Sequence, residues 1–305
     1  MSQVSGSDQD ELMLVKFEES LTQAGLSAST IVNYLADLRV FLRWGKREIG
    51  EQFSLARVSS DHVRLYRHYL AQELHRAAAT VNRHLMALRK FFALTKEMGL
   101  LAEDPTTEIA LVQEDGQANS RPLSKEEVEE LLAAAQKGSR AGLARRDLAI
   151  LHLLLHTGLK VSEIVALKKD DLVFEYPGVQ LKVCREWHED SKTRYLPLVG
   201  EVCKTLHEYL KVRPQTSTTD HFFLRQEGRP ISNRTVQRII GDCARAVGLE
   251  GVSAQSLRRT FALQLFSETH DLELVSERLG HQTKAITEQY LAVHEHHQQE
   301  VRSKE

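Results

Sequence analysis

Residues 252–290 read VSAQSLRRTFALQLFSETHDLELVSERLGHQTKAITEQY, and their polar side chains stand at unusual places for two packed helices. Arg258 and Arg259 open an apolar run, and a Leu-Gly-His sequence that ends at His281 closes the next one. Tyr290 follows His281 by nine residues, in a polar stretch with helical character. Charged, ionisable and aromatic residues at these intervals indicate a chemical site in addition to a fold.

These residue types suit chemistry at a phosphodiester. Because the diester is an anion, a nucleophile that attacks it needs positive charge already fixed in place. A guanidinium matches two phosphate oxygens, a tyrosine can form a covalent diester and later leave, and a histidine can donate a hydrogen bond or move a proton. Taken singly, each residue also has an ordinary role open to it. Tyr290 would be a packing aromatic, Arg258 a surface charge and His281 the residue after a glycine helix cap.

The joint pattern resembles the C-terminal signature of the tyrosine recombinases, the phage integrase family. That signature is H-x-L-R-H, then L-G-H, then a tyrosine nine residues later. The resemblance implies that Tyr290 is the nucleophile and that Arg258 and His281 surround the scissile phosphate. The first histidine of H-x-L-R-H is replaced here by Gln255. A glutamine can hydrogen-bond a phosphate oxygen but cannot take up a proton.

A second segment, residues 145–172, extends the resemblance. It predicts an apolar helix, a glycine stop at Gly158 and a short second helix. The family writes its centre as TGLRxSEL, with an arginine that clamps the phosphate, and Lys160 stands at that position. A lysine keeps the positive charge but lacks the planar guanidinium that makes two parallel hydrogen bonds to a phosphate. Residues 172–198 then alternate in polarity, which predicts a short antiparallel hairpin or sheet. In the family a lysine of this hairpin protonates the leaving hydroxyl. Lys192 is the candidate, with an ordinary turn lysine as the alternative.

The N-terminal third predicts a bundle of four or five helices. Residues 1–10 are rich in Ser, Gln and Asp and are expected to be disordered, whereas residues 11–102 carry apolar side chains at helical spacing. Residues 31–96 hold twelve Lys and Arg against five Asp and Glu, a local charge of +7 in a chain of net charge -2. A solvated helix face is the alternative, and the local excess favours contact with a phosphate backbone. In the family this bundle is the SAM-like core-binding domain. Residues 27–41 resemble the sequence motif of that domain.

Prolines at both ends indicate a linker at residues 103–122. Ser124 and Glu127 predict a capping box that starts the next helix. The resemblance makes residues 123–293 the catalytic domain and residues 294–305 a tail with a candidate role in assembly. The predicted fold is mainly α with a small antiparallel β-sheet, made of a helical core-binding domain and an α+β catalytic domain. The side chains predicted to contact DNA are Arg43, Lys46, Thr80, Asn82, Arg83, Arg89, Lys90, Arg234, Arg238 and Arg259.

Composition excludes several classes of protein. The 305 residues fit two domains, no apolar run is long enough to cross a bilayer, and the start lacks a signal-peptide pattern. Cys184, Cys203 and Cys243 are too widely spaced for a metal knuckle or a disulfide framework. We therefore expect reduced cysteines and a cytoplasmic protein without a membrane partner.

Two interpretations follow. The first is a site-specific DNA recombinase that cuts and rejoins DNA through a 3′-phosphotyrosyl link. It needs no metal or nucleotide cofactor, because the phosphotyrosine keeps the bond energy. Its partner is double-stranded DNA. We expect a monomer in solution, a tetramer on paired sites, and a second recombinase or accessory protein as a further candidate partner. The second interpretation, motivated by Lys160 and Gln255, is a DNA-binding protein of recombinase descent with weak or lost cleavage.

Overall fold

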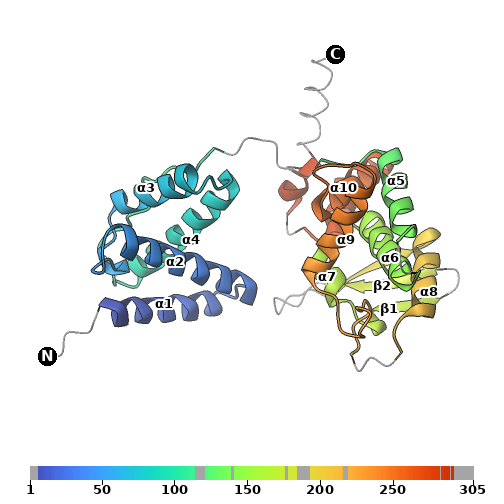
Figure 1. Ribbon diagram of the computed structural model, residues 1–305, viewed down its shortest axis with the longest axis horizontal. Helices are drawn as coiled ribbons and strands as arrows, with labels where there is room; N and C mark the ends of the chain where they lie inside the picture. Colours follow the sequence, from blue (N-terminus) through green and yellow to red (C-terminus); the bar gives the residue numbers. More distant parts are fainter. Residues whose placement is uncertain are drawn as a thin grey trace, which may run out of the picture. The chain divides into compact units, whose positions relative to one another are not determined.

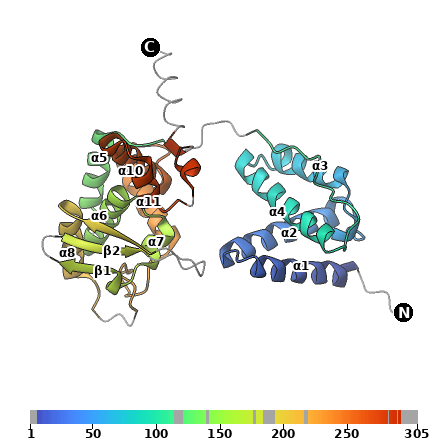
Figure 2. The same ribbon diagram turned by 180° about the vertical axis from the view of Figure 1, so that it is seen from behind.

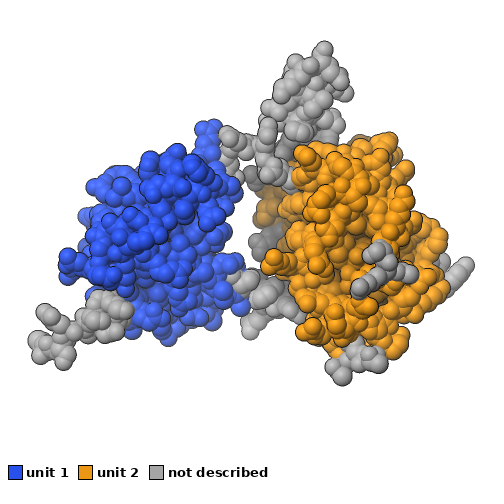
Figure 3. Space-filling model, viewed as in Figure 1, with its two compact units in different colours: residues 1–117, 187–189 blue, residues 118–186, 190–305 orange. Residues whose placement is uncertain are grey.

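The computed structural model describes residues 6–113, 121–138, 141–175, 178–183, 193–215, 219–281, 283–288 and 290–291. These residues form two compact units, one that ends at residue 113 and one that begins at residue 121 (Figure 1 and Figure 3). Both units are mostly helical, and the second holds a three-stranded antiparallel sheet. The predicted fold class is confirmed. Within the described ranges, no helix is long and apolar enough to cross a membrane.

The N-terminal unit is a helical bundle around an aromatic core. Phe41 and Tyr66 pack edge to face with ring centroids 4.9 Å apart, and Phe17 meets Phe91 at 5.3 Å. Ser27 caps the second helix by accepting a hydrogen bond from the backbone N–H of Thr30. The elements are α1 (Gly6–Gln23), α2 (Ala28–Glu48), η1 (Leu55–Arg57), α3 (Ser60–His68), the π-helical turn η2 (Tyr69–Glu73) and α4 (Ala78–Glu97).

Helix α1 begins at Gly6, earlier than the polar composition of residues 1–10 predicted. The reason is a long-range contact. Asp10 is buried and accepts a hydrogen bond from the backbone N–H of Leu55 at 2.7 Å. The buried face of the helix carries Met13 and Leu14, while Leu12 is 56% exposed.

The first part of the predicted linker, residues 103–112, belongs to the N-terminal unit. Ile109 is buried in the core of the bundle. The side-chain amide of Asn82 accepts from the Val112 N–H at 2.8 Å and donates to the Val112 carbonyl at 2.9 Å, and Arg89 donates to the carbonyl of Ile109. The chain therefore stays attached to the N-terminal unit as far as Val112, and the expected start of the linker at residue 103 is corrected.

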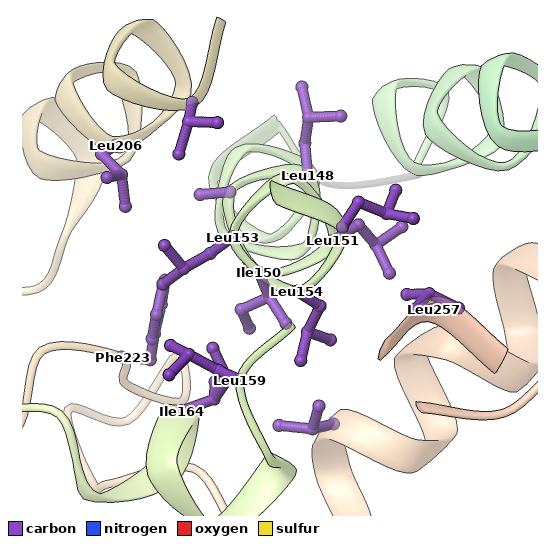
Figure 4. Close-up of a cluster of buried hydrophobic side chains, with 14 of the residues drawn as sticks. Leu148, Ile150, Leu151, Leu153, Leu154, Leu159, Ile164, Leu206, Phe223 and Leu257 are labelled. Carbon is purple, nitrogen blue, oxygen red and sulfur yellow. The ribbon is translucent and has the colours of Figure 1, made fainter. Parts of the chain in front are cut away.

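The C-terminal unit is built around α6, whose side chains Ile150, Leu151, Leu153 and Leu154 are fully buried (Figure 4). Helices α5, α8 and α10 pack against it. Ser124 and Glu127 form the predicted capping box at the start of α5. The helices are α5 (Lys125–Gln136), α6 (Ala141–Thr157), α7 (Val161–Ala166), α8 (Glu201–Val212), α9 (Asn233–Ala246), α10 (Ala254–Thr269) and α11 (Leu272–Leu279).

The sheet is an antiparallel meander of β1 (Leu172–Glu175), β2 (Gly178–Val183) and β3 (Arg194–Leu198). Its register pairs Val179 with Leu198 and Leu181 with Leu196, which keeps the apolar face inward as the alternation predicted. Residues 220–224 make isolated bridges, in which His221 pairs with Lys168 and Leu224 with Pro230. Phe222 and Phe223 between them are both buried.

Candidate active site

Arg258 lies at the centre of the candidate site. It is only 3% exposed, and its guanidinium donates to the carbonyls of Gly158 at 2.5 Å and Leu279 at 2.7 Å. Gly158 follows α6 and Leu279 ends α11, so one side chain of α10 ties its helix to the ends of two others. Figure 2 shows α10 and α11 side by side, in agreement with their packing contacts. Burial lowers the pKa of Arg258, while Tyr290 and Glu163 oppose this effect.

Gly158 permits this close approach. Its φ is +61°, in the left-handed region that favours glycine, and a Cβ atom at this position would lie 2.5 Å from the Phe261 ring and 2.7 Å from Leu279. A larger residue would therefore displace the carbonyl that holds Arg258. The glycine stop predicted after α6 is thus also part of the site.

Tyr290 is half-buried beside Arg258 and touches several groups of the site. Its hydroxyl makes a long, 3.5 Å hydrogen bond to the backbone carbonyl of Gln255. Its ring lies edge-on to His281 with centroids 5.5 Å apart, and the guanidinium carbon of Arg259 is 5.1 Å from its ring centroid. Burial raises the pKa of Tyr290, although Arg258 and Arg259 act in the opposite direction.

His281 is oriented by its backbone and by a buried threonine. Gly280 ends α11 with a left-handed φ of +66°, and the His281 N–H donates to the carbonyl of Ser276 at 3.0 Å. The ring Nδ1 is 2.9 Å from the hydroxyl of Thr287, which is fully buried. Thr287 is not recognisable from the sequence, since a threonine in a polar stretch carries no special signal.

A buried ion pair borders the site. The carboxylate of Glu163 in α7 meets the guanidinium of Arg194 in β3 with two contacts of 3.0 Å, and both side chains are nearly buried. The same carboxylate accepts the backbone N–H of Lys160 at 2.7 Å. Glu163 therefore fixes the start of α7 against the sheet, and with it the backbone of Lys160, whose side chain is exposed. The sequence had assigned no role to Arg194.

The structure thus brings Tyr290, Arg258 and His281 together, with Lys160 two residues after Gly158. Gln255 contributes a backbone carbonyl, and its side chain is exposed. Lys192 lies outside the described residues.

The side chains predicted to contact DNA fall into two groups. Asn82 and Arg89 hold the linker, Arg83 pairs with the buried Asp37 at 2.5 Å, and Arg259 is buried against Tyr290. The others are at least partly exposed on α2, α4 and α9: Arg43, Lys46, Thr80, Lys90, Arg234 and Arg238.

Comparisons with known proteins agree with this arrangement. Residues 121–297 match the phage integrase family, and residues 14–99 match the phage integrase N-terminal SAM-like domain. The tyrosine recombinase XerD of Listeria monocytogenes serotype 4b (strain F2365) is 30% identical over 279 residues, which cover 90% of this chain and 91% of that protein. The tyrosine recombinase XerC of Roseiflexus castenholzii (strain DSM 13941 / HLO8) is 31% identical over 276 residues, covering 88% and 84%.

Solved structures share the fold at lower identity. The XerH site-specific recombinase bound to its palindromic difH substrate superposes with a TM-score of 0.69 at 22% identity, covering 90% of this chain and 79% of that one. A lambda integrase dimer bound to a COC′ core site gives a TM-score of 0.69 at 17% identity, covering 92% and 76%.

Proposed function

The chain belongs to the phage integrase family and is a tyrosine recombinase that cleaves and rejoins DNA, and on this premise we propose that Tyr290 is its nucleophile. One observation carries the proposal. Tyr290 lies beside a buried arginine, Arg258, that is held by carbonyls from two other parts of the family signature. A fixed cation next to a phenol is what attack on an anionic phosphate requires.

The proposed cleavage step exchanges one phosphodiester for another. The Tyr290 hydroxyl oxygen attacks the scissile phosphorus, the new phosphorus–oxygen bond forms, and the bond from phosphorus to the 5′-oxygen breaks. The phenol loses its proton, and the leaving 5′-oxygen gains one to become a hydroxyl. The 3′ end then carries a phosphotyrosyl link, which the 5′-hydroxyl of a partner strand attacks to rejoin the DNA. Because the number of diester bonds is unchanged, no external energy source is needed.

Each remaining residue has a proposed part in this step. Arg258 supplies preorganised positive charge, since its carbonyl contacts hold the guanidinium before DNA arrives. His281, oriented by Thr287, donates a hydrogen bond to the phosphate or carries a proton. Lys160 offers a point charge and Gln255 a neutral hydrogen bond. Lys192 is proposed to protonate the leaving 5′-oxygen.

The proposed partner is double-stranded DNA. The local charge of +7 in residues 31–96 supports contact of the N-terminal unit with a phosphate backbone. Residues 11–102 would act as the core-binding domain and residues 123–293 as the catalytic domain. We propose a monomer that forms a tetramer on paired sites, with residues 294–305 in its assembly. Light scattering with and without DNA tests this step.

The decisive experiment is a covalent-trapping assay on nicked cognate DNA. Tyr290→Phe removes the nucleophilic oxygen and should eliminate the covalent adduct while leaving DNA affinity unchanged. Tyr195→Phe is a matched control, because Tyr195 is 55% exposed on β3 and should keep the wild-type amount of adduct. Adduct that persists in Tyr290→Phe would exclude Tyr290 as the nucleophile.

A second candidate function rests on the two altered positions. With Lys160 and Gln255 in place of the family's arginine and histidine, the chain would bind its sites and cleave weakly or not at all. Loss of the two parallel hydrogen bonds from an arginine guanidinium to the phosphate costs about 2–4 kcal/mol of transition-state stabilisation, by analogy with the loss of an oxyanion-hole donor. That penalty corresponds to roughly 10²–10³ in rate. The same trapping assay separates the two functions, because this candidate predicts tight binding without adduct.

A further inference from the structure

Arg259 occupies a different place from the one its sequence position suggested. The Arg258-Arg259 pair reads as two basic residues at the start of a helix, and Arg259 was predicted to contact DNA. It is instead only 8% exposed, and its guanidinium carbon lies over the Tyr290 ring. Neighbouring residues of a helix point about 100° apart. Arg258 can therefore reach Gly158 and Leu279 while Arg259 covers the tyrosine.

We infer that Arg259 is a positioning residue for the nucleophile: its guanidinium lies against the Tyr290 ring, holds that ring in place for attack and stabilises negative charge on the phenol. This inference rests on the proposed role of Tyr290. Arg259 itself need not touch the DNA.

The contacts around Tyr290 show what Arg259 adds. His281 meets the ring at its edge, and the Gln255 carbonyl meets the hydroxyl at a long 3.5 Å. Arg258 also acts on the hydroxyl. The guanidinium of Arg259 adds a contact over the face of the ring, which limits how the ring can tilt. Because small misplacements of a reacting group cost large factors in rate, this contact bears directly on cleavage.

The charge of Arg259 has a second effect. Among the described residues, the charged or titratable groups that face Tyr290 are Arg258 and Arg259 from α10 and His281 from the turn after α11. The Glu163–Arg194 pair acts on Arg258 from α7 and β3. Burial raises the pKa of Tyr290, and the two arginines partly offset that rise. A cation attracts a phenolate more strongly than a phenol, so Arg259 favours loss of the proton.

The same attraction operates in both directions of the reaction. During cleavage the phenol oxygen gives up its proton, and during rejoining it leaves the phosphorus with the electrons of the broken bond. Both directions pass through one transition state with a partly anionic oxygen. Loss of Arg259 should therefore slow cleavage and rejoining by similar factors. The fraction of adduct at equilibrium on an intact substrate should change little.

Arg259→Met in the full chain tests the inference. At saturating protein on nicked DNA, we expect the cleavage rate to fall about tenfold. The apparent pKa of the pH–rate profile should rise. Arg259→Lys keeps the charge without the planar face and should fall between wild type and Arg259→Met. DNA affinity and its salt dependence should stay unchanged. Arg245→Met is the matched control, because Arg245 is exposed on α9 and pairs with Asp242; its cleavage rate should equal that of the wild type.

Other results would overturn the inference. An unchanged cleavage rate and pH profile would exclude positioning. A loss of affinity with a salt slope lower by about one would instead show a direct phosphate contact, as the sequence predicted. If Arg259→Met fails to fold, Arg259→Lys and Arg259→Gln decide by the same two readouts. Wild-type protein that forms no adduct would refute the role of Tyr290 and this inference with it, whereas a wild-type rate of adduct formation in Arg259→Met refutes the inference alone.

Discussion

Lys160 shows how one side chain can alter a site whose backbone is well fixed. Its N–H is held by the carboxylate of Glu163, and Glu163 is itself clamped by Arg194. The position of the main chain therefore does not depend on the side chain at residue 160. What changes is the group offered to a phosphate, because an ammonium acts as a point charge where a guanidinium would make two parallel hydrogen bonds. Arg258 then carries most of the fixed geometry.

Lys160→Arg is the informative substitution. If the lysine merely weakens a working site, the guanidinium of Lys160→Arg should raise the cleavage rate by about tenfold. This change corresponds to ~1.4 kcal/mol of activation free energy. Lys160→Ala should lower it. The rate is measured by single-turnover adduct formation, with Lys169→Arg, an exposed lysine after α7, as the control. A lower rate in Lys160→Arg would show that the pocket has adapted to lysine. Tight binding without adduct in both wild type and Lys160→Arg would favour the DNA-binding alternative.

At the scale of single residues, the sequence predicted the side chains proposed to act on the phosphate. It did not predict the side chains that position them. Tyr290, Arg258 and His281 stood out because their types and spacing together resemble the signature of the tyrosine recombinases. Thr287 and Arg194 did not, since a threonine near a histidine or an arginine in a strand is common. Their roles come from contacts across six and 31 residues of chain, respectively.

At the scale of elements, both ends of the linker are anchored. Asn82 pairs with both backbone groups of Val112 at one end. At the other end, the Leu123 N–H donates to the hydroxyl of Thr260 at 2.8 Å, and Leu123 is buried. Thr260 follows Arg259 on α10, so the linker joins the catalytic unit next to the residues of the site. Residues 113–122 connect the two anchors, and their number sets the greatest distance that this segment can span.

Asn82→Ala should release the first anchor and lengthen the free linker. Because the entropy cost of closing a loop grows slowly with its length, we expect DNA affinity to fall only about twofold. Deletion of three residues from 114–120 should restore the affinity of Asn82→Ala, as measured by fluorescence anisotropy. Asn33→Ala, at an exposed position on α2, is the control. If shortening the linker fails to rescue Asn82→Ala, the asparagine contacts DNA directly, as the sequence predicted.

Element boundaries were harder to predict than the elements themselves. Proline and polar composition marked residues 103–122 as lacking regular structure, which does not reveal that Ile109 packs in the core. The early start of α1 depends in the same way on the contact between Asp10 and Leu55, which are 45 residues apart. Local sequence patterns cannot register such long-range contacts.

At the scale of the whole molecule, charge is distributed unevenly. The chain has a net charge of -2, yet residues 31–96 carry +7. Part of that excess is internally engaged: Arg83 is held by Asp37, and Arg89 by the linker. Arg43 and Lys90 are exposed and remain candidates for phosphate contact. The total charge is therefore a poor guide to the partner, and the count of exposed cations is a better one.

This distribution predicts how DNA binding responds to salt. Each phosphate that a cation neutralises releases counterions, so the logarithm of affinity should fall linearly with the logarithm of salt concentration. If about six to ten phosphates are contacted, affinity should drop by roughly 10³–10⁵ between ~50 and ~200 mM salt. Arg43→Met and Lys90→Met should each lower the slope by about one.

Arg83→Met should instead destabilise the bundle, because it leaves the buried Asp37 carboxylate without its guanidinium. Fluorescence anisotropy across a salt series gives the slope, and urea unfolding gives the stability. A flat salt dependence, or a slope unaffected by Arg43→Met and Lys90→Met, would show that the charged bundle does not bind the DNA backbone.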